Sequence, residues 1–212
     1  MIRLRRAAIV AFCLHLLAGF SMAFVLRRGL QTNTVLQDRL AFLLNDRVFW
    51  TVGWLAWTAA ALAILYFYIA FAEAHQPSMR FAVLLTVAAI GPDLAGQAIE
   101  VGVLPSIANH AYGANTAPEL FLMVHRAAVM LSGYLANGLY SLTALMLAWR
   151  TRHAYPSWVW LAGVAVGVFG LMLSVAALMD STAGMFWTNV LLVPTILLWL
   201  GGVAVFSSPL PR

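Results

Sequence analysis

The stretch of sequence that decides the fold is residues 81–104, FAVLLTVAAIGPDLAGQAIEVGVL. About 20 apolar residues are needed to cross the hydrocarbon core of a bilayer as a helix, and this stretch is long enough despite its two carboxylates. The apolar residues on both sides of Glu100 favour a helix that continues through it. The alternative is a helix that ends near Ile90, with residues 93–100 in a loop in water, because burying an ionised carboxylate is costly. We predict the membrane-spanning helix.

Five further apolar segments of spanning length flank this stretch. Only 9% of the 212 residues are charged and 63% are hydrophobic, whereas a soluble domain carries about 25% charged residues. Lipid must therefore be the main solvent, and backbone groups in lipid are paired within helices. Trp50, Trp149, Trp158 and Trp187 lie near segment ends, where an aromatic belt is expected. We predict an all-α polytopic transmembrane bundle of six helices in a single domain, 1–212, with helices at about 7–26, 48–72, 81–104, 118–149, 157–179 and 184–206.

The arginines indicate the orientation of the bundle. All twelve basic residues are Arg, which is typical of a GC-rich bacterial genome. The N-terminal sequence MIRLRR resembles the start of a signal peptide, but the apolar run 7–26 ends in Arg27-Arg28 and predicts a retained first helix. With the N-terminus inside, the inner side holds seven arginines and the outer side five. The positive-inside rule thus favours both termini in the cytoplasm, with the protein in a bacterial inner membrane.

Residues 29–47 do not have the pattern of a plain loop. Four leucines share one helical face, which we place opposite the charged residues of the segment, and the two sets are Leu36, Leu40, Leu43 and Leu44 against Asp38, Arg39 and Arg47. This pattern predicts a short amphipathic helix that lies in the membrane interface. An extension of the following helix is the alternative.

Three polar residues form a stripe on the predicted helix 81–104. Asp93, Gln97 and Glu100 are spaced i, i+4 and i+7, so they share one helical face. Ionisable groups within membrane spans are rare and usually functional. Gly91 and Pro92 precede the stripe and loosen the helix there. The stripe is suited to holding a proton, binding a cation or acting as an acid and a base.

Other polar residues fall at a similar depth in the six-helix arrangement. They are His125, Arg126 and, deeper, Tyr140 in the fourth helix, Asp180 at the end of the fifth, and Asn189 in the sixth. We predict that these side chains and the stripe line one polar pocket in the outer half of the bilayer. Structural roles are the alternatives: a hydrogen-bond donor for His125, an ion pair with Glu119 or Glu100 for Arg126, a helix end for Asp180 and interhelical contacts for Asn189.

The sequence offers little to a cofactor or to nucleic acid. The one cysteine, Cys13, excludes a disulfide within the chain. His15 falls toward the opposite leaflet from His125, so the two make a poor pair of haem ligands, and no metal site or cofactor is expected. The net charge of +5 is spread over segment ends rather than gathered on a basic face, so no nucleic-acid partner is expected.

Two stretches resemble known families. Residues 133–141, GYLANGLYS, continuing through Trp158 to Gly170, resemble an uncharacterised family of small bacterial multi-pass membrane proteins with no assigned chemistry. Residues 186–194, FWTNVLLVP, are similar to the final helix of sterol-isomerase-type membrane proteins, which places an Asn and a Trp beside acidic residues around a lipophilic ligand. Here the Trp precedes the Asn, and the spacing differs.

Three functions fit the predicted pocket. The first is an intramembrane isomerase- or cyclase-like enzyme, with Asp93, Glu100 and His125 as acid–base groups and Gln97, Arg126, Tyr140, Asp180 and Asn189 binding a lipophilic substrate or membrane lipid. The second is a non-catalytic subunit or assembly factor, held to a membrane-protein partner or a second copy by small-residue faces such as Gly163 and Gly167. The third is a small proton- or cation-coupled transporter that uses the two carboxylates.

Overall fold

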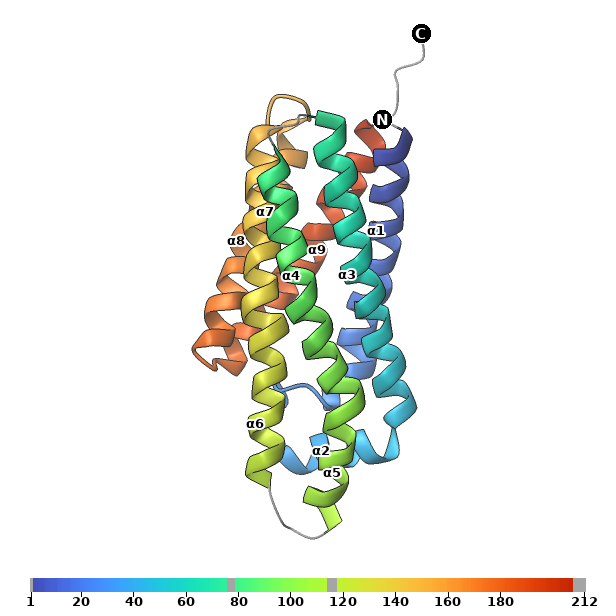
Figure 1. Ribbon diagram of the computed structural model, residues 1–212, viewed down its shortest axis with the longest axis vertical. Helices are drawn as coiled ribbons and strands as arrows, with labels where there is room; N and C mark the ends of the chain where they lie inside the picture. The colour runs from blue at the N-terminus through green and yellow to red at the C-terminus, as the bar shows by residue number, and fades with distance from the viewer. Residues whose placement is uncertain (1, 76–78, 114–117, 208–212) are drawn as a thin grey trace.

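The protein is a bundle of long, nearly parallel helices in a computed structural model that describes residues 2–75, 79–113 and 118–207 (Figure 1). Its α-helices are α1 (Ile2–Phe20), α2 (Leu36–Asn45), α3 (Arg47–His75), α4 (Arg80–Ala98), α5 (Leu104–Gly113), α6 (Pro118–Val129), α7 (Asn137–Arg150), α8 (Ser157–Leu178) and α9 (Thr182–Phe206). Three π-helical segments join or extend them: η1 (Ser21–Val25), η4 (Ile99–Val103) and η5 (Met130–Ala136). A 3-10 turn, η2 (Leu26–Arg28), follows η1.

The prediction of six spanning helices is confirmed. Among the described residues, six helical segments are long and apolar enough to cross a membrane: Ile2–Arg28, Arg47–His75, Arg80–Tyr112, Pro118–Arg150, Ser157–Leu178 and Thr182–Phe206. The third runs through α4, η4 and α5 without a break, with Pro92 inside α4. The alternative of a water-exposed loop at 93–100 is therefore wrong.

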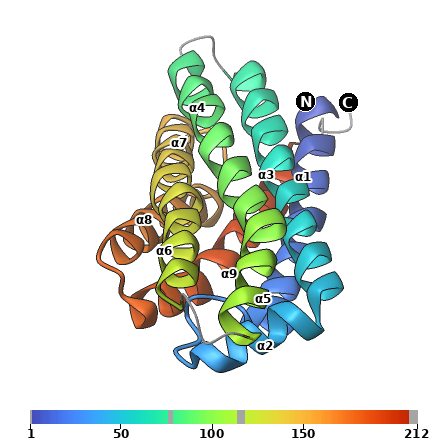
Figure 2. The same ribbon diagram turned by 60° about the horizontal axis from the view of Figure 1, so that its bottom comes forward.

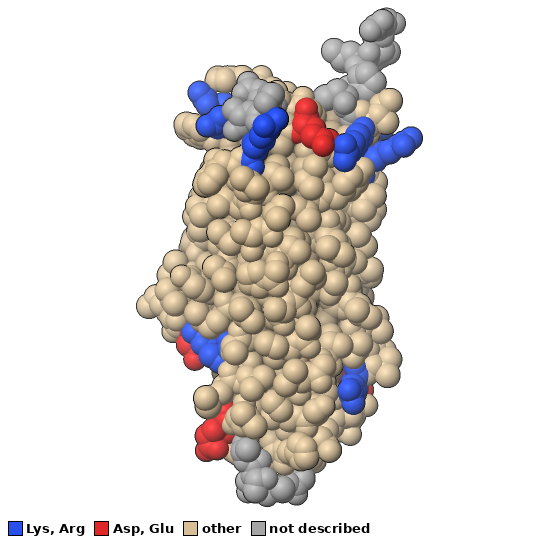
Figure 3. All heavy atoms as spheres, in the orientation of Figure 1, with Lys and Arg blue, Asp and Glu red and all other residues tan. Residues whose placement is uncertain are grey.

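An even number of spans brings the start of α1 and the end of α9 to the same end of the bundle, which we call the proximal end (Figure 1). The third and fourth spans have 33 residues each, about 50 Å of helix, and exceed a hydrocarbon core of about 30 Å. At the opposite, distal end they project with α2, which lies across the end of the bundle (Figure 2). Charged side chains lie toward the two ends of this face of the molecule, with an uncharged belt between them (Figure 3).

Helix α2 is separate from α3, as the amphipathic pattern predicts, because the backbone leaves the helical conformation at Asp46. Its inner face packs on α5 and α6, where Leu40 and Leu43 join a cluster with Leu104 and Phe121. The assignment of Arg39 to the polar face was wrong, since this side chain is only 5% exposed. Arg39 lies three residues after Leu36 and four before Leu43, so it shares the face of those leucines.

Three of the four tryptophans that were assigned to an aromatic belt are exposed. Trp149, Trp158 and Trp187 are exposed on the outside of the bundle, as predicted. Trp50 is fully buried, so its assignment to the belt is corrected. It packs edge-on against Trp54 at a ring-centroid separation of 5.7 Å, because α2 covers this end of α3 and joins the same cluster.

Glycines allow α8 to approach α7 and α9 closely. A Cβ atom at Gly163 would lie 2.7 Å from both Ala148 Cβ and a ring atom of Trp199. A Cβ atom at Gly167 would lie 2.9 Å from the backbone carbonyl oxygen of Ser141. The small-residue face is thus occupied within the chain and is not free for a partner.

Gly167→Ala is expected to lower the free energy of unfolding by about 1–3 kcal/mol, because the added methyl group overpacks the α7–α8 contact. Gly91→Ala is the matched control, since nothing lies within 4 Å of a Cβ atom there. Unfolding in a denaturing detergent, followed by tryptophan fluorescence, measures both. Equal stability of the two variants would contradict the packing assigned to α8.

Candidate functional site

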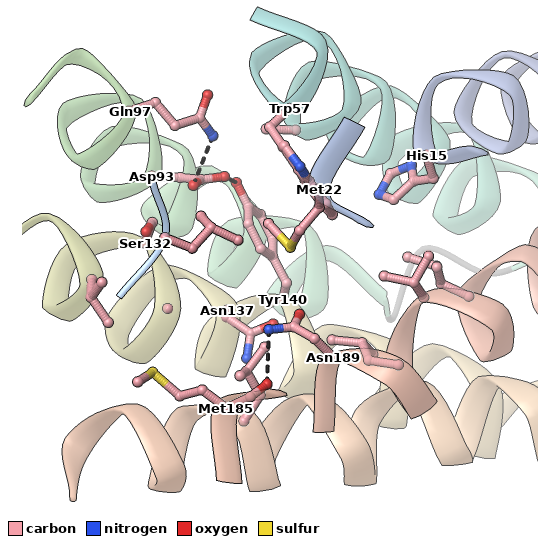
Figure 4. A pocket seen from close by; sticks show the side chains of 18 of the residues that line it. His15, Met22, Trp57, Asp93, Gln97, Ser132, Asn137, Tyr140, Met185 and Asn189 are labelled. Carbon is pink, nitrogen blue, oxygen red and sulfur yellow. Dashed lines mark hydrogen bonds between the residues drawn. The ribbon is translucent and has the colours of Figure 1, made fainter. Parts of the chain in front are cut away.

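A cavity of about 220 Å³ lies between the spanning helices, and its wall is mostly apolar. Every one of the six spans contributes lining residues, as does the connection between η2 and α2. An apolar cavity of about 150 Å³ is large enough to bind benzene, so this one has room for a larger lipophilic group. Figure 4 shows the polar side chains that face this space from α1, α3, α4, η5, α7 and α9.

The three π-helical segments all border the cavity. Met22 comes from η1, Glu100 from η4, and Ser132 and Gly133 from η5. A π turn inserts an extra residue into the helix and is frequently found at functional sites. Here each π turn changes the direction in which the following side chains point, next to the same space.

Asp93 is held by donors from two helices. Gln97 Nε2 donates to its Oδ1 at 3.0 Å, and the Tyr140 hydroxyl donates to its Oδ2 at 3.1 Å (Figure 4). Thr58 of α3 in turn donates to the Gln97 side-chain oxygen. In the part of the chain that the structure describes, no basic side chain forms an ion pair with Asp93.

Glu100 belongs to a buried chain of three ionisable groups. Arg39 of α2 contacts His125 Nδ1 of α6, and His125 Nε2 lies 3.4 Å from Glu100 Oε1. A guanidinium has donors and no acceptor, so Nδ1 must accept and carry no proton. The imidazole is then neutral with its proton on Nε2, facing the carboxylate. The positive charge of Arg39 and the negative charge of Glu100 balance each other through this ring.

Opposite charges and an aromatic ring favour the charged form of Arg39 against the effect of burial. Burial lowers the pKa of Arg39 from its ordinary value, while the charges of Glu100 and Asp180 act in the opposite direction. An arginine stays protonated even so. Its guanidinium also lies over the Phe121 ring, 5.2 Å from the centroid, which adds a cation–π contact.

Four polar atoms of residues that line the cavity are buried without a hydrogen-bond partner among the described residues. They are Gln31 Oε1, Trp54 Nε1, Trp57 Nε1 and Glu100 Oε2. A buried polar group without a partner costs about 1–3 kcal/mol, so such groups in a native protein point to a partner that binds there.

Six of the eight predicted site residues line this same cavity: Asp93, Gln97, Glu100, His125, Tyr140 and Asn189. The proposed catalytic role of His125 as a base does not fit, because Arg39 occupies one ring nitrogen and the other carries the proton. Asn189 donates its amide to the Met185 carbonyl of its own helix at 3.0 Å.

Arg126 and Asp180 do not line the cavity, and their assignment to it is corrected. They form an ion pair at 3.1 Å, with Asp180 58% exposed, and Arg126 also donates to the Leu178 carbonyl. Arg126 follows His125 directly, so it lies about 100° round the helix and points away from the bundle interior. Asp180 lies in the turn between α8 and α9 with a left-handed backbone, φ 55°, which suits a turn residue.

Sequence reasoning missed several lining residues. Trp54, Trp57 and Tyr68 face the cavity from α3. His15 also lines it, because the cavity reaches deeper toward the proximal end than the predicted pocket. Its Nδ1 contacts the Ala11 carbonyl at 2.8 Å, which leaves Nε2 for other contacts. The spacing of the three aromatic residues on one helix was the available signal.

Within the described ranges, no group of three or more His, Cys, Asp or Glu side chains is arranged to hold a metal ion. Comparisons of the chain with protein-family models, with curated proteins and with solved structures gave no match. The two family resemblances noted in the sequence therefore stay predictions, and the function rests on the cavity.

Proposed function

We propose that the protein is an intramembrane enzyme that binds a lipophilic substrate in the cavity and isomerises it by acid–base catalysis. The observation that carries the proposal is the pair of buried carboxyl groups, Asp93 and Glu100, on one helix face in an apolar cavity and in different charge surroundings. Pairs of titratable groups in contrasting environments are the usual source of separate acid and base roles.

The surroundings assign the two roles. Glu100 is the ionised base, because the charge of Arg39 balances its own. Asp93, which no described cation faces, carries the proton in the proposed reaction. The Tyr140 hydroxyl turns from Asp93 Oδ2 to the substrate and gives it its own proton, and the proton of Asp93 replaces it. Gln97 lies between the two carboxylic residues on the helix, and its amide group fixes the position of the Asp93 carboxyl group.

The spacing of the two carboxyl groups fits a double-bond shift. Seven residues of helix place the two Cα atoms about 10 Å apart along the axis. Glu100 and the Asp93–Tyr140 pair each exchange a proton with an atom about 3 Å away, so the two act on different carbons of one substrate. Glu100 removes a proton from one carbon, the double bond moves, and the acid pair protonates the other carbon. The substrate gains and loses one proton, and no oxidant or reductant is required.

The packing of α8 argues against the non-catalytic subunit. That function relied on free small-residue faces, and Gly163 and Gly167 are filled by Ala148, Trp199 and Ser141 of the same chain. We place the protein in a bacterial inner membrane with both termini in the cytoplasm. The multi-pass architecture and the arginines near the proximal end, on α1, α4 and α7, support this location.

Exchange with solvent deuterium tests the proposed reaction on whichever lipophilic compound is the substrate. The purified protein, in lipid nanodiscs with a bacterial lipid extract, is incubated in D₂O, and the lipids are surveyed by mass spectrometry. An acid–base isomerase exchanges carbon-bound protons with solvent, so at least one lipophilic compound is expected to gain deuterium with time. Empty nanodiscs are the control. If no compound is labelled above that control, the isomerase is excluded.

A further inference from the structure

The unpaired atoms of the cavity wall indicate the polar group of the ligand. We propose that the substrate is a lipophilic alcohol or phenol whose hydroxyl group binds between Glu100 and the indole N–H groups of Trp54 and Trp57. This inference rests on the proposed function and names its substrate class.

Two contacts place these three residues on the same part of the wall. Trp50 Nε1 donates to the Glu100 backbone carbonyl at 2.7 Å. The Trp50 ring also packs against Trp54, which lies one turn further along α3. Thr58 lies two turns after Trp50 on α3 and contacts Gln97, which lies one turn before Glu100 on the neighbouring helix. Trp54 and Trp57 lie between these two contacts, so α3 runs beside the α4–η4 segment over this stretch.

The unpaired atoms on this stretch match one functional group. Three polar atoms of these lining residues are buried and without partners among the described residues: one acceptor, Glu100 Oε2, and two donors, Trp54 Nε1 and Trp57 Nε1. A hydroxyl group has one donor and two acceptor lone pairs, so it can satisfy all three. The fourth unpaired lining atom, Gln31 Oε1, lies apart on the η2–α2 connection, where the amide group of that side chain contacts the exposed Asp180.

Other polar groups leave part of this set unpaired. An ammonium group has donors only, so both indoles would stay without an acceptor. A carboxylate has acceptors only and would be repelled by Glu100, and a carbonyl group would leave Glu100 Oε2 unpaired. A hydrocarbon would satisfy none of the three. The apolar remainder of the cavity then accommodates the hydrocarbon part of the alcohol.

Four ligands with the same ten-carbon chain test the inference: 1-decanol, decane, decylamine and decanoic acid. Binding to the full-length protein in lipid nanodiscs is measured as the excess over empty nanodiscs, which removes simple partitioning into lipid. 1-Decanol is expected to bind at least about 10-fold more tightly than each of the others, because the others leave buried groups unpaired. Equal binding of decane and decanol would overturn the inference, as would preference for the amine or the acid.

Trp57→Phe and Trp54→Phe keep an aromatic ring and remove the N–H group. Each is expected to weaken decanol binding about 5- to 10-fold and to leave decane binding unchanged. Trp187→Phe, on the exposed face of α9, is the matched control. Unchanged decanol affinity in both cavity variants would overturn the inference. Loss of alcohol selectivity with deuterium labelling intact would sink this inference alone, whereas failure of labelling with selective decanol binding would sink the isomerase alone.

Discussion

Arg39→Met is expected to lower the free energy of unfolding by about 3–5 kcal/mol, the usual cost of removing one partner of a buried ion pair. The side chain is only 5% exposed and sits at the end of the Arg39–His125–Glu100 chain. Without it, the carboxylate of Glu100 would be buried with no compensating charge. Methionine fills a similar volume and removes the charge, so the effect reports electrostatics rather than a cavity.

A double-mutant cycle separates this effect from a general loss of packing. Arg39→Met and Glu100→Gln each leave one buried charge unpaired, whereas the double variant has neither charge. The double variant is therefore expected to be more stable than the sum of the single effects predicts, by about 1–3 kcal/mol. Arg47→Met, at the exposed start of α3, is the control and should change stability by less than about 0.5 kcal/mol. Additive effects of the two substitutions would contradict charge balance through His125.

The partner of Glu100 could not be predicted from the sequence. Six spans follow from hydrophobic length alone, and the stripe of Asp93, Gln97 and Glu100 follows from helical periodicity, so both are readable from local sequence. Which residue faces a carboxylate is set by the packing of distant elements. Arg39 and Glu100 lie on α2 and η4, far apart in the chain, and only the packing of α2 against α5 and α6 brings them together.

The π turns were also beyond the sequence. Each shifts the angular register of a helix, so a helical wheel drawn through it misplaces the residues that follow. The predicted pocket nevertheless gathered most of its members, because Asp93, Gln97 and Glu100 precede or begin η4 and His125 precedes η5. Arg126 was misassigned for a different reason, namely that polarity at the right depth says nothing about the direction in which a side chain points.

The protonation of His125 likewise needed the structure. From the sequence, a base and a hydrogen-bond donor were both open roles for a histidine at this depth. The contact with Arg39 decides between them, because an arginine next to Nδ1 fixes the proton on the other nitrogen. His125 therefore transmits the charge of Arg39 to Glu100 and is a positioning residue in the proposed reaction.

Glu100→Gln and Asp93→Asn are each expected to slow deuterium labelling of the substrate at least about 100-fold, the lower range of what a positioned acid or base contributes. Each substitution keeps the size of the side chain and removes its ability to exchange a proton. The matched controls are Glu119→Gln and Asp38→Asn, which make the same chemical changes at exposed positions on α6 and α2 and should leave labelling unchanged.

Stability must be separated from catalysis in these variants, because Glu100→Gln leaves the Arg39 charge unpaired. The variant Arg39→Met/Glu100→Gln removes both charges and so tests the base in a protein without that penalty. Its labelling rate is expected to stay at least about 100-fold below that of the wild type even where its unfolding free energy recovers. Tyr140→Phe should slow labelling by a smaller factor, about 10-fold, since it interrupts the relay from Asp93 and leaves both carboxyl groups in place. Wild-type labelling in a folded Arg39→Met/Glu100→Gln protein would remove Glu100 from the reaction and with it the assignment of the base.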